Sequence, residues 1–478
     1  MTPMPSVVDR GLGRAWADAG RGQPARAVLA GRRVTVVGLA RSGVAACRLL
    51  RTLRAEVTGT DAGHPDRRSA AASALAQEGV RLHLGANPPE AFGEAELVVV
   101  SPGVPLDHPR LVECRGRGVP VIGEVELAYR VTTADVVAIT GTNGKTTTTS
   151  LVGALLGEGG RQVLVGGNIG HPLAGEALAF PEDGIIVAEV SSFQLETVDR
   201  FRPRVAMLLN LTPDHLDRHG TLEVYRAAKA RIFARQTAAD WAVVNADDPG
   251  AAALAGRAPG RLLWTSRQHE VREGAFVENA WVTLRLGHWE SPVAPVAEIG
   301  LRGTHNLENV LAATAGAGAL GVSPERLRAG IRGFRAVAHR LELVRERAGV
   351  AYYNDSKGTN VDATLKALAA FPEPIVLIAG GRDKGQRFEA LVEAARGHVK
   401  AAVLIGEGRA TLGPPLRSVT AVDEAGSMAE AVARAAALAG PGDVVLLSPA
   451  CASFDMFRDY EHRGEVFKSE VRALPELP

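Results

Sequence analysis

The fold of this chain is decided by the segment Val136-Val137-Ala138-Ile139-Thr140-Gly141-Thr142-Asn143-Gly144-Lys145-Thr146-Thr147. An apolar, β-branched run leads into a glycine loop, and the loop leads into a run of threonines. Glycines let backbone N–H groups face phosphate oxygens, and a helix N-terminus adds its partial positive charge. This order of strand, glycine loop and helix is typical of a phosphate-binding loop in an α/β fold.

The loop is a shortened form of the general pattern, because Ile139 stands where the first glycine is usual. Lys145 is suited to bridge β- and γ-phosphates, and the Thr146 hydroxyl suits Mg²⁺. A tight turn with a surface lysine is the alternative, but it does not explain four consecutive threonines. We therefore expect the following residues to bind ATP: Gly141, Thr142, Asn143, Gly144, Lys145, Thr146, Thr147 and Thr148.

Short apolar runs alternate with longer helical stretches on both sides of this loop, which favours an α/β fold. The length of 478 residues fits about three domains. We expect a Rossmann-like domain over 31–125, a central P-loop ATPase-type domain with a parallel or mixed sheet over 126–336, and a Rossmann-like α/β domain over 337–478. Residues 1–30 are expected to be a mostly disordered extension or a misplaced start, with a contact arm as the functional alternative.

Composition and charge argue against several classes of protein. The net charge of +1 predicts no attraction to nucleic acid or to acidic membranes. No apolar run is long enough to span a membrane, and charged residues interrupt the first 30 positions, so neither membrane insertion nor a signal peptide is expected. Three widely separated cysteines fit a reducing compartment. We expect a cytoplasmic protein.

Lysine is scarce, since only seven of the 54 basic residues are lysines. Arginine serves where a surface position needs only positive charge, so a retained lysine marks a place that requires a compact, reactive amine. A biased genome composition explains the scarcity but not the placement. Four lysines fall in the motifs that carry the functional prediction: Lys145, Lys229, Lys357 and Lys384.

The segment from Gly38 to Gly43 is a weak dinucleotide fingerprint, because its middle glycine is replaced by Ala40. Asp61 follows at a distance suited to a ribose hydroxyl, and Ser42 begins the next helix. We favour binding of a nucleotide substrate here, with NAD binding and plain packing as alternatives.

Three further side chains are candidates for a metal site. Glu189 ends an apolar run, so it should lie at the carboxyl edge of the sheet, where α/β proteins bind ligands. His215 follows another strand, and Lys229 belongs to a helix. A bare lysine would repel Mg²⁺, whereas a carbamate formed from CO₂ on Lys229 would be anionic. His215 as a general base and Lys229 as a solvated helix residue are the alternatives.

These motifs resemble those of the ATP-dependent Mur ligases over roughly residues 33–470. The loop from Gly141 to Thr146 is common to that superfamily, while three other segments look like its D-glutamate-adding branch: 189–196, 354–360 and 448–457. The Asp-Asn-Pro-Arg motif of the diamino-acid branch is missing, and Asn143 stands where the L-alanine branch has histidine.

The resemblance implies a monomeric ligase of peptidoglycan precursor synthesis. Such an enzyme adds D-glutamate to UDP-N-acetylmuramoyl-L-alanine through an acyl phosphate and releases ADP and phosphate. The implied catalytic residues are Lys145, Glu189, His215, Lys229 and Lys357. Two Mg²⁺ ions would be held by Thr146, Glu189, His215 and carbamylated Lys229. Closure of the domains around ATP and substrate is expected.

The resemblance also implies binding residues. Further ATP contacts would come from Asn309, Arg340 and Asp355, and nucleotide-sugar contacts from Ser42, Asp61, Ser101, Asn168 and His215. D-glutamate contacts would come from Lys357, Thr359, Lys384, Ser453 and Tyr460, the last standing where the family often has phenylalanine. An interdomain salt bridge is the alternative for Arg340, and a solvated loop lysine for Lys384.

Other function classes remain as alternatives. They are another Mur-type ligase, a folylpolyglutamate synthetase-like amide ligase, a nucleotide-regulated binding protein with a degenerate site, and an NAD oxidoreductase. Intact Lys145, Glu189 and His215 argue against the degenerate site. Ala40 argues against the NAD enzyme.

Overall fold

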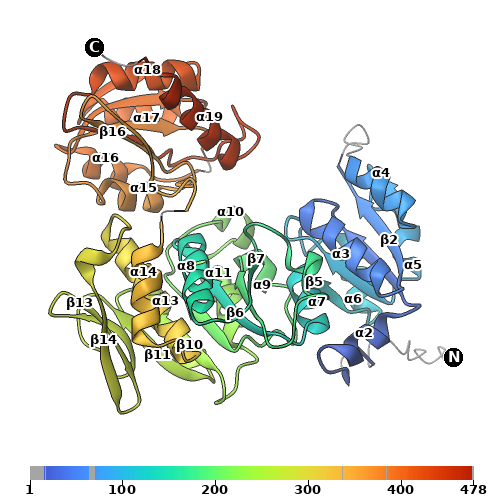
Figure 1. Ribbon diagram of the computed structural model, residues 1–478. Helices are drawn as coiled ribbons and strands as arrows, with labels where there is room; N and C mark the ends of the chain where they lie inside the picture. Colours follow the sequence, from blue (N-terminus) through green and yellow to red (C-terminus); the bar gives the residue numbers. More distant parts are fainter. Residues whose placement is uncertain (1–14, 17, 64–69, 336, 384, 476–478) are drawn as a thin grey trace, which may run out of the picture.

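A computed structural model describes residues 15, 16, 18–63, 70–335, 337–383 and 385–475. These residues form three sheets, each covered by helices, and the sheets follow one another along the chain (Figure 1). The central part carries the N-terminal part on one side and the C-terminal part on the other. The expected three-part α/β class is confirmed. None of the helices in the described ranges is both long and apolar enough to span a membrane.

The N-terminal sheet has the order β3-β2-β1-β4-β5, and its described pairings are parallel. Its strands are β1 Arg33–Val37, β2 Glu56–Asp61, β3 Arg81–Leu84, β4 Leu97–Val100 and β5 Val121–Gly123. Its helices are α3 Arg41–Thr52, α4 Ala70–Gln77, α5 Glu90–Gly93 and α6 Pro109–Gly116. The chain reverses direction across the sheet between β1 and β4, and ligands bind at such switch points in open α/β sheets.

The predicted disorder of residues 1–30 is wrong for the part that the structure describes. Helix α2 spans Gln23–Leu29, and Trp16 and Leu29 are buried. Arg21 donates to the Tyr129 carbonyl at 3.2 Å, and Arg26 donates to the Val131 carbonyl at 2.8 Å. Burial of these apolar side chains and the hydrogen bonds of the arginines hold the segment on α7 (Glu124–Val131). Positions 1–14 and 17 lie outside the described residues.

The central sheet has the order β14-β13-β12-β11-β10-β9-β6-β8-β7. Pairing is parallel from β7 to β12 and antiparallel from β12 to β14. The strands are β6 Asp135–Thr140, β7 Val163–Gly167, β8 Ile185–Glu189, β9 Val205–Leu208, β10 Trp241–Asn245, β11 Arg261–Ser266, β12 Gly274–Glu278, β13 Trp281–Leu286 and β14 Trp289–Pro295. Because β6 lies between β8 and β9, their carboxyl ends meet at one edge.

Helix α8 (Lys145–Glu158) packs on α13 (Thr304–Ala319) and α14 (Pro324–Gly333), and their apolar side chains join the core on one face of this sheet. Gly316 allows α13 to approach β9 closely, since a β-carbon there would lie 1.9 Å from the Met207 methyl group. The shorter elements are α9 Ser192–Leu195, α10 Leu216–His219, α11 Leu222–Ala230, α12 Pro249–Ala252, and the 3₁₀ turns η2 Leu173–Gly175, η3 Arg231–Phe233, η4 Ala255–Arg257 and η5 Val296–Glu298.

The C-terminal sheet has the order β15-β16-β20-β17-β18-β19, with an antiparallel β15–β16 hairpin at one edge and parallel pairs elsewhere. Its strands are β15 Glu342–Arg347, β16 Val350–Asn354, β17 Ile375–Gly380, β18 Val399–Ile405, β19 Ala421–Glu424 and β20 Val444–Leu447. Its helices are α15 Val361–Leu368, α16 Glu389–Ala395, α17 Arg409–Leu416, α18 Met428–Leu438 and α19 Tyr460–Ala473. Helix α15 lies on the side facing the central part (Figure 1).

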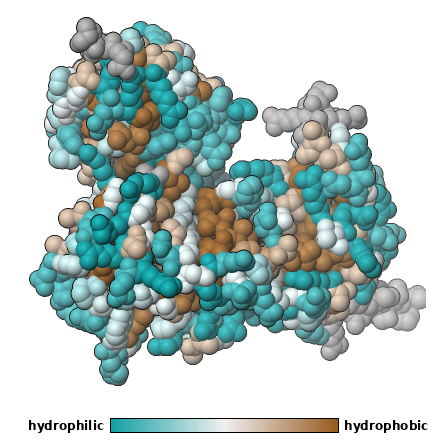
Figure 2. All heavy atoms as spheres, in the orientation of Figure 1, coloured by the Kyte–Doolittle hydropathy of each residue, from teal (hydrophilic) through white to brown (hydrophobic). Residues whose placement is uncertain are grey.

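Hydrophilic residues cover most of the outer surface on the face drawn in Figure 2. Apolar residues gather in the middle of that view, over the central part and between the other two.

Candidate functional site

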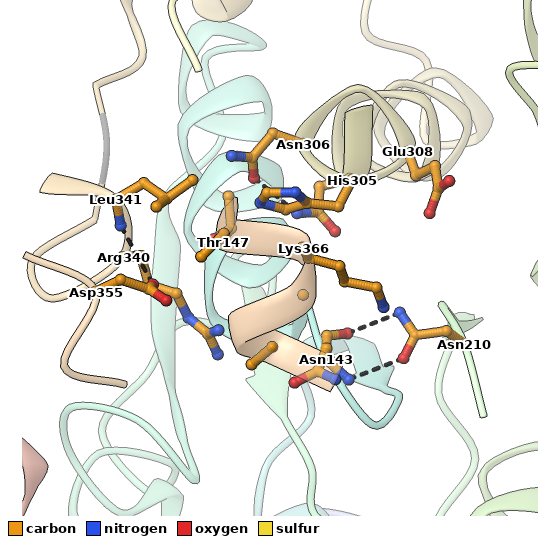
Figure 3. A pocket seen from close by; sticks show the side chains of 14 residues that line it. Asn143, Thr147, Asn210, His305, Asn306, Glu308, Arg340, Leu341, Asp355 and Lys366 are labelled. Carbon is orange, nitrogen blue, oxygen red and sulfur yellow. Dashed lines mark hydrogen bonds between the residues drawn. The ribbon is translucent and has the colours of Figure 1, made fainter. Parts of the chain in front are cut away.

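The predicted phosphate loop lies between β6 and α8. Gly144 has φ 83°, and a β-carbon there would lie 2.4 Å from the Asn309 side-chain oxygen, so only glycine fits. Asn210, after β9, fixes the loop from both sides (Figure 3). Its side chain accepts from the Asn143 N–H at 2.8 Å and donates to the Asn143 carbonyl at 3.0 Å. The loop is therefore held in shape by the neighbouring strand end.

A chain of hydrogen bonds joins the loop to the ends of β8 and β16. Lys357 Nζ donates to Thr146 Oγ1 at 2.5 Å, and Thr146 Oγ1 donates to Glu189 Oε2 at 2.7 Å. Asn168 Nδ2 donates to the other oxygen of Glu189 at 2.9 Å. Four of the predicted site residues therefore meet at one point, and Lys357 reaches it from the C-terminal domain.

The charge of Glu189 is maintained although the side chain is buried. Burial by itself raises the pKa of this carboxyl, but the ammonium groups of Lys357 and Lys145 outweigh it and hold the pKa below its usual value. The hydrogen bonds from Asn168 and Thr146 act in the same direction. Glu189 is thus an anionic oxygen donor at the edge of the phosphate loop.

Lys145 folds back onto its own loop. Its Nζ donates to the Gly141 carbonyl at 2.9 Å and to the Thr142 carbonyl at 2.7 Å. Burial lowers the pKa of Lys145, Glu189 raises it, and the nearby Arg340 lowers it further. Backbone carbonyls are weaker partners for an ammonium than phosphate oxygens, so this lysine is available to an anion that enters the loop.

Lys229 lies beneath the loop and is 1% exposed. Its Nζ donates to the Gly141 carbonyl at 2.8 Å and to Thr140 Oγ1 at 3.3 Å. Among the described residues, no carboxylate forms an ion pair with it. Burial first, and then the charge of Lys145, lower the pKa of Lys229 well below its usual value. The buried position therefore disfavours the charged form of this amine relative to that of an exposed lysine.

His215 directly precedes α10 as its N-cap residue and has a left-handed backbone, with φ 52°. Its Nε2 lies 3.6 Å from Asp214, and its ring packs against Phe193 with centroids 4.9 Å apart. Over the described ranges, no three His, Cys, Asp or Glu side chains gather to hold a metal. Thr146 and Glu189 are brought together as predicted, while the metal-ligand role of His215 stays a prediction.

A pocket between the central and C-terminal domains contains the remaining predicted ATP residues (Figure 3). Asn309, from α13, accepts a hydrogen bond from Thr148 Oγ1 at 3.1 Å. Asp355 accepts from Ser448 Oγ at 2.9 Å, and its burial raises its pKa to about 6. The lining also includes His305, Asn306, Glu308, Arg340, Leu341 and Lys366.

Arg340 points into this pocket with its hydrogen-bonding capacity incompletely used. Its Nε is buried and has no hydrogen-bond partner among the described residues. No salt bridge of Arg340 is found in that part of the chain either, which does not support the interdomain salt bridge. An unpaired buried donor is costly, and an anionic ligand would satisfy it.

The predicted nucleotide-sugar residues of the first domain share a cleft of about 540 Å³ at the switch point between β1 and β4. Ser42, Asp61 and Ser101 all line it. Asp61 Oδ2 accepts from the Leu39 N–H at 2.6 Å, and Ser101 Oγ donates to the Gly38 carbonyl at 2.7 Å. Both side chains therefore also fix the glycine turn.

Two of the predicted amino-acid residues, Thr359 and Tyr460, lie next to Lys357. The ring of Tyr460, at the start of α19, has its centroid 5.2 Å from Lys357 Nζ. The Thr359 N–H donates to the Lys357 carbonyl at 2.9 Å. Ser453 is buried in the loop after β20, and that loop contacts the Lys357 loop through Ala450 N–H and the Gly358 carbonyl at 2.9 Å. Lys384 lies outside the described residues.

Two residues that the sequence did not single out also belong to the site. Asn210 fixes the phosphate loop, and its signal was its place at the end of an apolar strand. Asp362, at the start of α15, accepts from Asn143 Nδ2 at 2.5 Å. A pairing between residues of different domains leaves no local pattern, so sequence reasoning had no signal for Asp362.

Models of three known domains match the chain. Residues 32–123 match the model described as Mur ligase MurD-like, N-terminal domain. Residues 139–317 match the Mur ligase middle domain, and residues 339–451 match the Mur ligase, glutamate ligase domain.

Individual relatives give a consistent result. The UDP-N-acetylmuramoylalanine--D-glutamate ligase of Acidobacterium capsulatum is 49% identical over 93% of this chain and 97% of its own length. The protein of the same name from Koribacter versatilis is 47% identical over 93% and 98%. Among solved structures, the MurF ligase of Thermotoga maritima in complex with ADP has a TM-score of 0.57 at 17% identity, covering 93% of this chain and 99% of that one. That similarity supports the fold.

Proposed function

Because this chain belongs to the Mur ligase family, we propose that it uses ATP to join D-glutamate to UDP-N-acetylmuramoyl-L-alanine in peptidoglycan precursor synthesis. The carboxylate of the nucleotide-sugar substrate attacks the γ-phosphorus of ATP, and ADP leaves. The amine of D-glutamate then attacks the acyl phosphate and loses a proton, and phosphate leaves as the amide forms. We further propose that the enzyme acts as a monomer in the cytoplasm.

One contact carries this proposal, the hydrogen bond from Lys357 Nζ to Thr146 Oγ1 at 2.5 Å. It brings a C-terminal-domain cation to the phosphate loop. The attacking carboxylate and the ATP phosphates are all anions, so their approach requires positive charge from the protein. Lys145 and Lys357 are the cations nearest the loop, and Arg340 points into the adjoining pocket. In our proposal these three groups offset the repulsion during phosphoryl transfer.

The side chains near Thr146 fit a magnesium site that substrate completes. Mg²⁺ in nucleotide sites is held through one or two carboxylates together with phosphates and water. Glu189 is anionic, and its Oε2 lies 2.7 Å from Thr146 Oγ1. These two oxygens are therefore close enough to bind the same Mg²⁺ ion. Mg²⁺ bound there would neutralise the charge on the phosphates. A carbamate on Lys229 would supply a second anion, and we include His215 in the proposed set.

The ends of the proposed substrate path are the cleft of the first domain and the loops around Lys357. Ser42, Asp61 and Ser101 are proposed to bind the UDP group. Asn168 and His215 are proposed to contact the muramoyl part near the reacting carboxylate. The amino-acid site is proposed to include Thr359, Lys384, Ser453 and Tyr460.

A phosphate-release assay tests the proposal directly. Purified full-length protein is given ATP, Mg²⁺ and UDP-N-acetylmuramoyl-L-alanine, and each of D-glutamate, L-glutamate, L-alanine and a diamino acid is added in turn. We expect release only with D-glutamate, together with a new amide product by mass spectrometry. Release with L-alanine or a diamino acid but not with D-glutamate would reject the substrate assignment in favour of another Mur-type ligase.

A further inference from the structure

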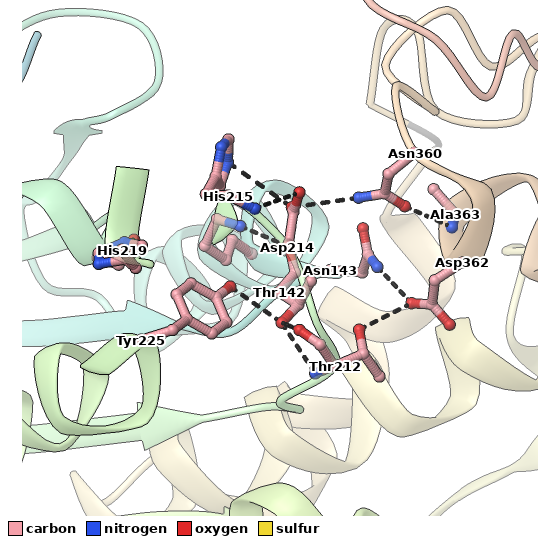
Figure 4. A network of polar contacts seen from close by, with 12 residues as sticks. Thr142, Asn143, Thr212, Asp214, His215, His219, Tyr225, Asn360, Asp362 and Ala363 are labelled. Carbon is pink, nitrogen blue, oxygen red and sulfur yellow. Dashed lines mark hydrogen bonds and ion pairs between the residues drawn. The ribbon is translucent and has the colours of Figure 1, made fainter. Parts of the chain in front are cut away.

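Two pairs of side chains cross the interface between the central and C-terminal domains in a reciprocal arrangement (Figure 4). Asn143 of the phosphate loop donates to Asp362 Oδ2 at 2.5 Å. In the opposite sense, Asn360 Nδ2 donates to Asp214 Oδ2 at 3.3 Å. Each domain therefore contributes one amide and one carboxylate. Both C-terminal partners lie at the N-terminal end of α15, since Asn360 is its N-cap and Asp362 is in its first turn.

Asp362 is the better connected of the two carboxylates. The same oxygen that accepts from Asn143 also accepts from Thr212 Oγ1 at 3.4 Å and from Lys366 Nζ at 3.0 Å. Thr212 belongs to the loop after β9, which leads to His215. One carboxylate oxygen thus ties the start of α15 to the two central loops that surround the phosphate site.

Lys357 lies on the same segment of the chain as this attachment. Lys357 stands five positions before Asp362 in the same connecting segment, and it reaches Thr146 on the phosphate loop. Asn360, between them, caps α15 by accepting from the Ala363 N–H at 2.8 Å. The segment is therefore fixed to the central domain at both ends, and release of the Asp362 end would let Lys357 move away from the loop.

We propose that Asp362 is a positioning residue for the ligase reaction, because its carboxylate holds the C-terminal domain on the phosphate loop and thereby sets Lys357 against Thr146. The kinetic part of the test rests on the proposed function, because it measures the ligase reaction. The inference also makes a prediction about domain arrangement that does not depend on which amino acid is the substrate.

The first part of the test uses three variants of the full-length chain. Asp362→Ala removes the acceptor, while Asp362→Asn keeps an oxygen that can accept from Asn143 but loses the charge. We expect kcat to fall about tenfold or more in Asp362→Ala, the loss typical of one charge-assisted hydrogen bond, and to recover to within about threefold of the native value in Asp362→Asn. Glu393→Ala, an exposed change on α16, is the matched control and should leave kcat unchanged.

The Lys366→Met variant tests whether Asp362 acts only through its ion pair with Lys366. That side chain lines the ATP pocket, so its loss should raise the KM for ATP and leave kcat at saturating ATP largely intact. Equal losses of kcat in Lys366→Met and Asp362→Ala would overturn the assignment. So would a native kcat in Asp362→Ala when the unmodified enzyme is active.

Small-angle scattering gives the readout that does not require turnover. We expect a larger radius of gyration for Asp362→Ala than for the native protein and the Glu393→Ala control, because the C-terminal domain is released. Identical scattering profiles would overturn the inference. If the native protein releases no phosphate with D-glutamate, the proposed function fails, whereas the scattering comparison still decides the role of Asp362.

Discussion

At the scale of single residues, the most consequential feature is a lysine buried without a carboxylate partner among the described residues. Lys229 Nζ donates to the Gly141 carbonyl and to Thr140 Oγ1 and lies 4.8 Å from the centroid of the Tyr225 ring, and burial lowers its pKa well below the usual value. We predict that Lys229→Ala loses at least about a hundredfold in kcat, because the variant cannot form the proposed carbamate, which would be an anionic ligand next to the transferring phosphate. Acetate or formate should restore part of the activity by filling the space. Phosphate release measures both effects, and full activity without added carboxylate would remove the carbamate from the proposal.

A second residue-scale prediction concerns pH. Burial lowers the pKa of Lys357 to about 8, with Glu189 opposing the shift. A lysine acts on phosphate only as the ammonium, so the active fraction of free enzyme falls as pH rises through this value. We predict that kcat/KM for ATP declines above about pH 8. In Lys357→Arg the guanidinium stays charged, so its smaller residual activity should show no such decline. An identical alkaline limb in both proteins would contradict the assignment to Lys357.

The sequence anticipated most of these residues because they stand at strand ends and in loops of fixed chemistry. Lys145, Thr146 and Glu189 follow apolar β-branched runs, so their place at one sheet edge was predictable. Asp362 was missed because its partners Asn143 and Thr212 belong to another domain. The burial that changes the acid–base behaviour of Lys229 and Lys357 is likewise set by tertiary packing, which no local pattern records.

At the scale of elements, α7 is the connection on which the first two domains meet. Glu124, at its start, is buried and accepts from the Ala174 N–H at 2.6 Å, and burial raises its pKa from 4.5 to about 7. The folded state therefore holds more protons than the unfolded state between these values, and stability falls as pH rises through that window. We predict that Glu124→Gln is more stable than the native protein by roughly 2–3 kcal/mol at pH 8 and gains little at pH 5. Denaturant unfolding at both pH values measures this, and a gain independent of pH would refute it.

The N-terminal segment also stabilises α7 by packing against it. Arg130, buried and paired with Glu126 at 2.9 Å, stacks on the Trp16 ring and donates to the Trp16 carbonyl at 2.9 Å. We predict that Trp16→Ala lowers the free energy of unfolding by about 3–5 kcal/mol, the cost of deleting a buried tryptophan, while kcat stays within about twofold. Thermal unfolding is the measurement. Val112→Ala, at a position that is 53% exposed, is the control and should change little.

The error in predicting this segment has a physical cause. Charged residues interrupt the first 30 positions, and nothing in the composition indicated that these charges would take part in docking. In the structure Arg21 and Arg26 donate to backbone carbonyls at the end of α7, so their charges assist docking. Their aliphatic stems can pack while the guanidinium groups find acceptors, a behaviour that composition alone does not convey.

At the scale of the whole molecule, the alternation of apolar runs and helices specified three α/β units, whereas their mutual placement came only from the structure. The predicted ATP residues Asn309 and Arg340 belong to different domains, yet they line one pocket. A ligand bound there couples two domains, because its contacts are lost when either one unfolds or moves away.

Arg340 is the residue through which this coupling should be visible. Its buried Nε lacks a partner among the described residues, so Arg340→Ala should not lower stability without ligand. With ATP, the native protein should melt at a higher temperature, and the variant should lose most of that gain because the phosphate contact is missing. Its KM for ATP should rise by about tenfold or more, the usual loss for a charge-assisted contact. Calorimetry with and without ATP measures both effects. If ATP raised the melting temperature of both proteins equally, Arg340 would not be an ATP contact. ATP would then not hold the two domains together through this side chain.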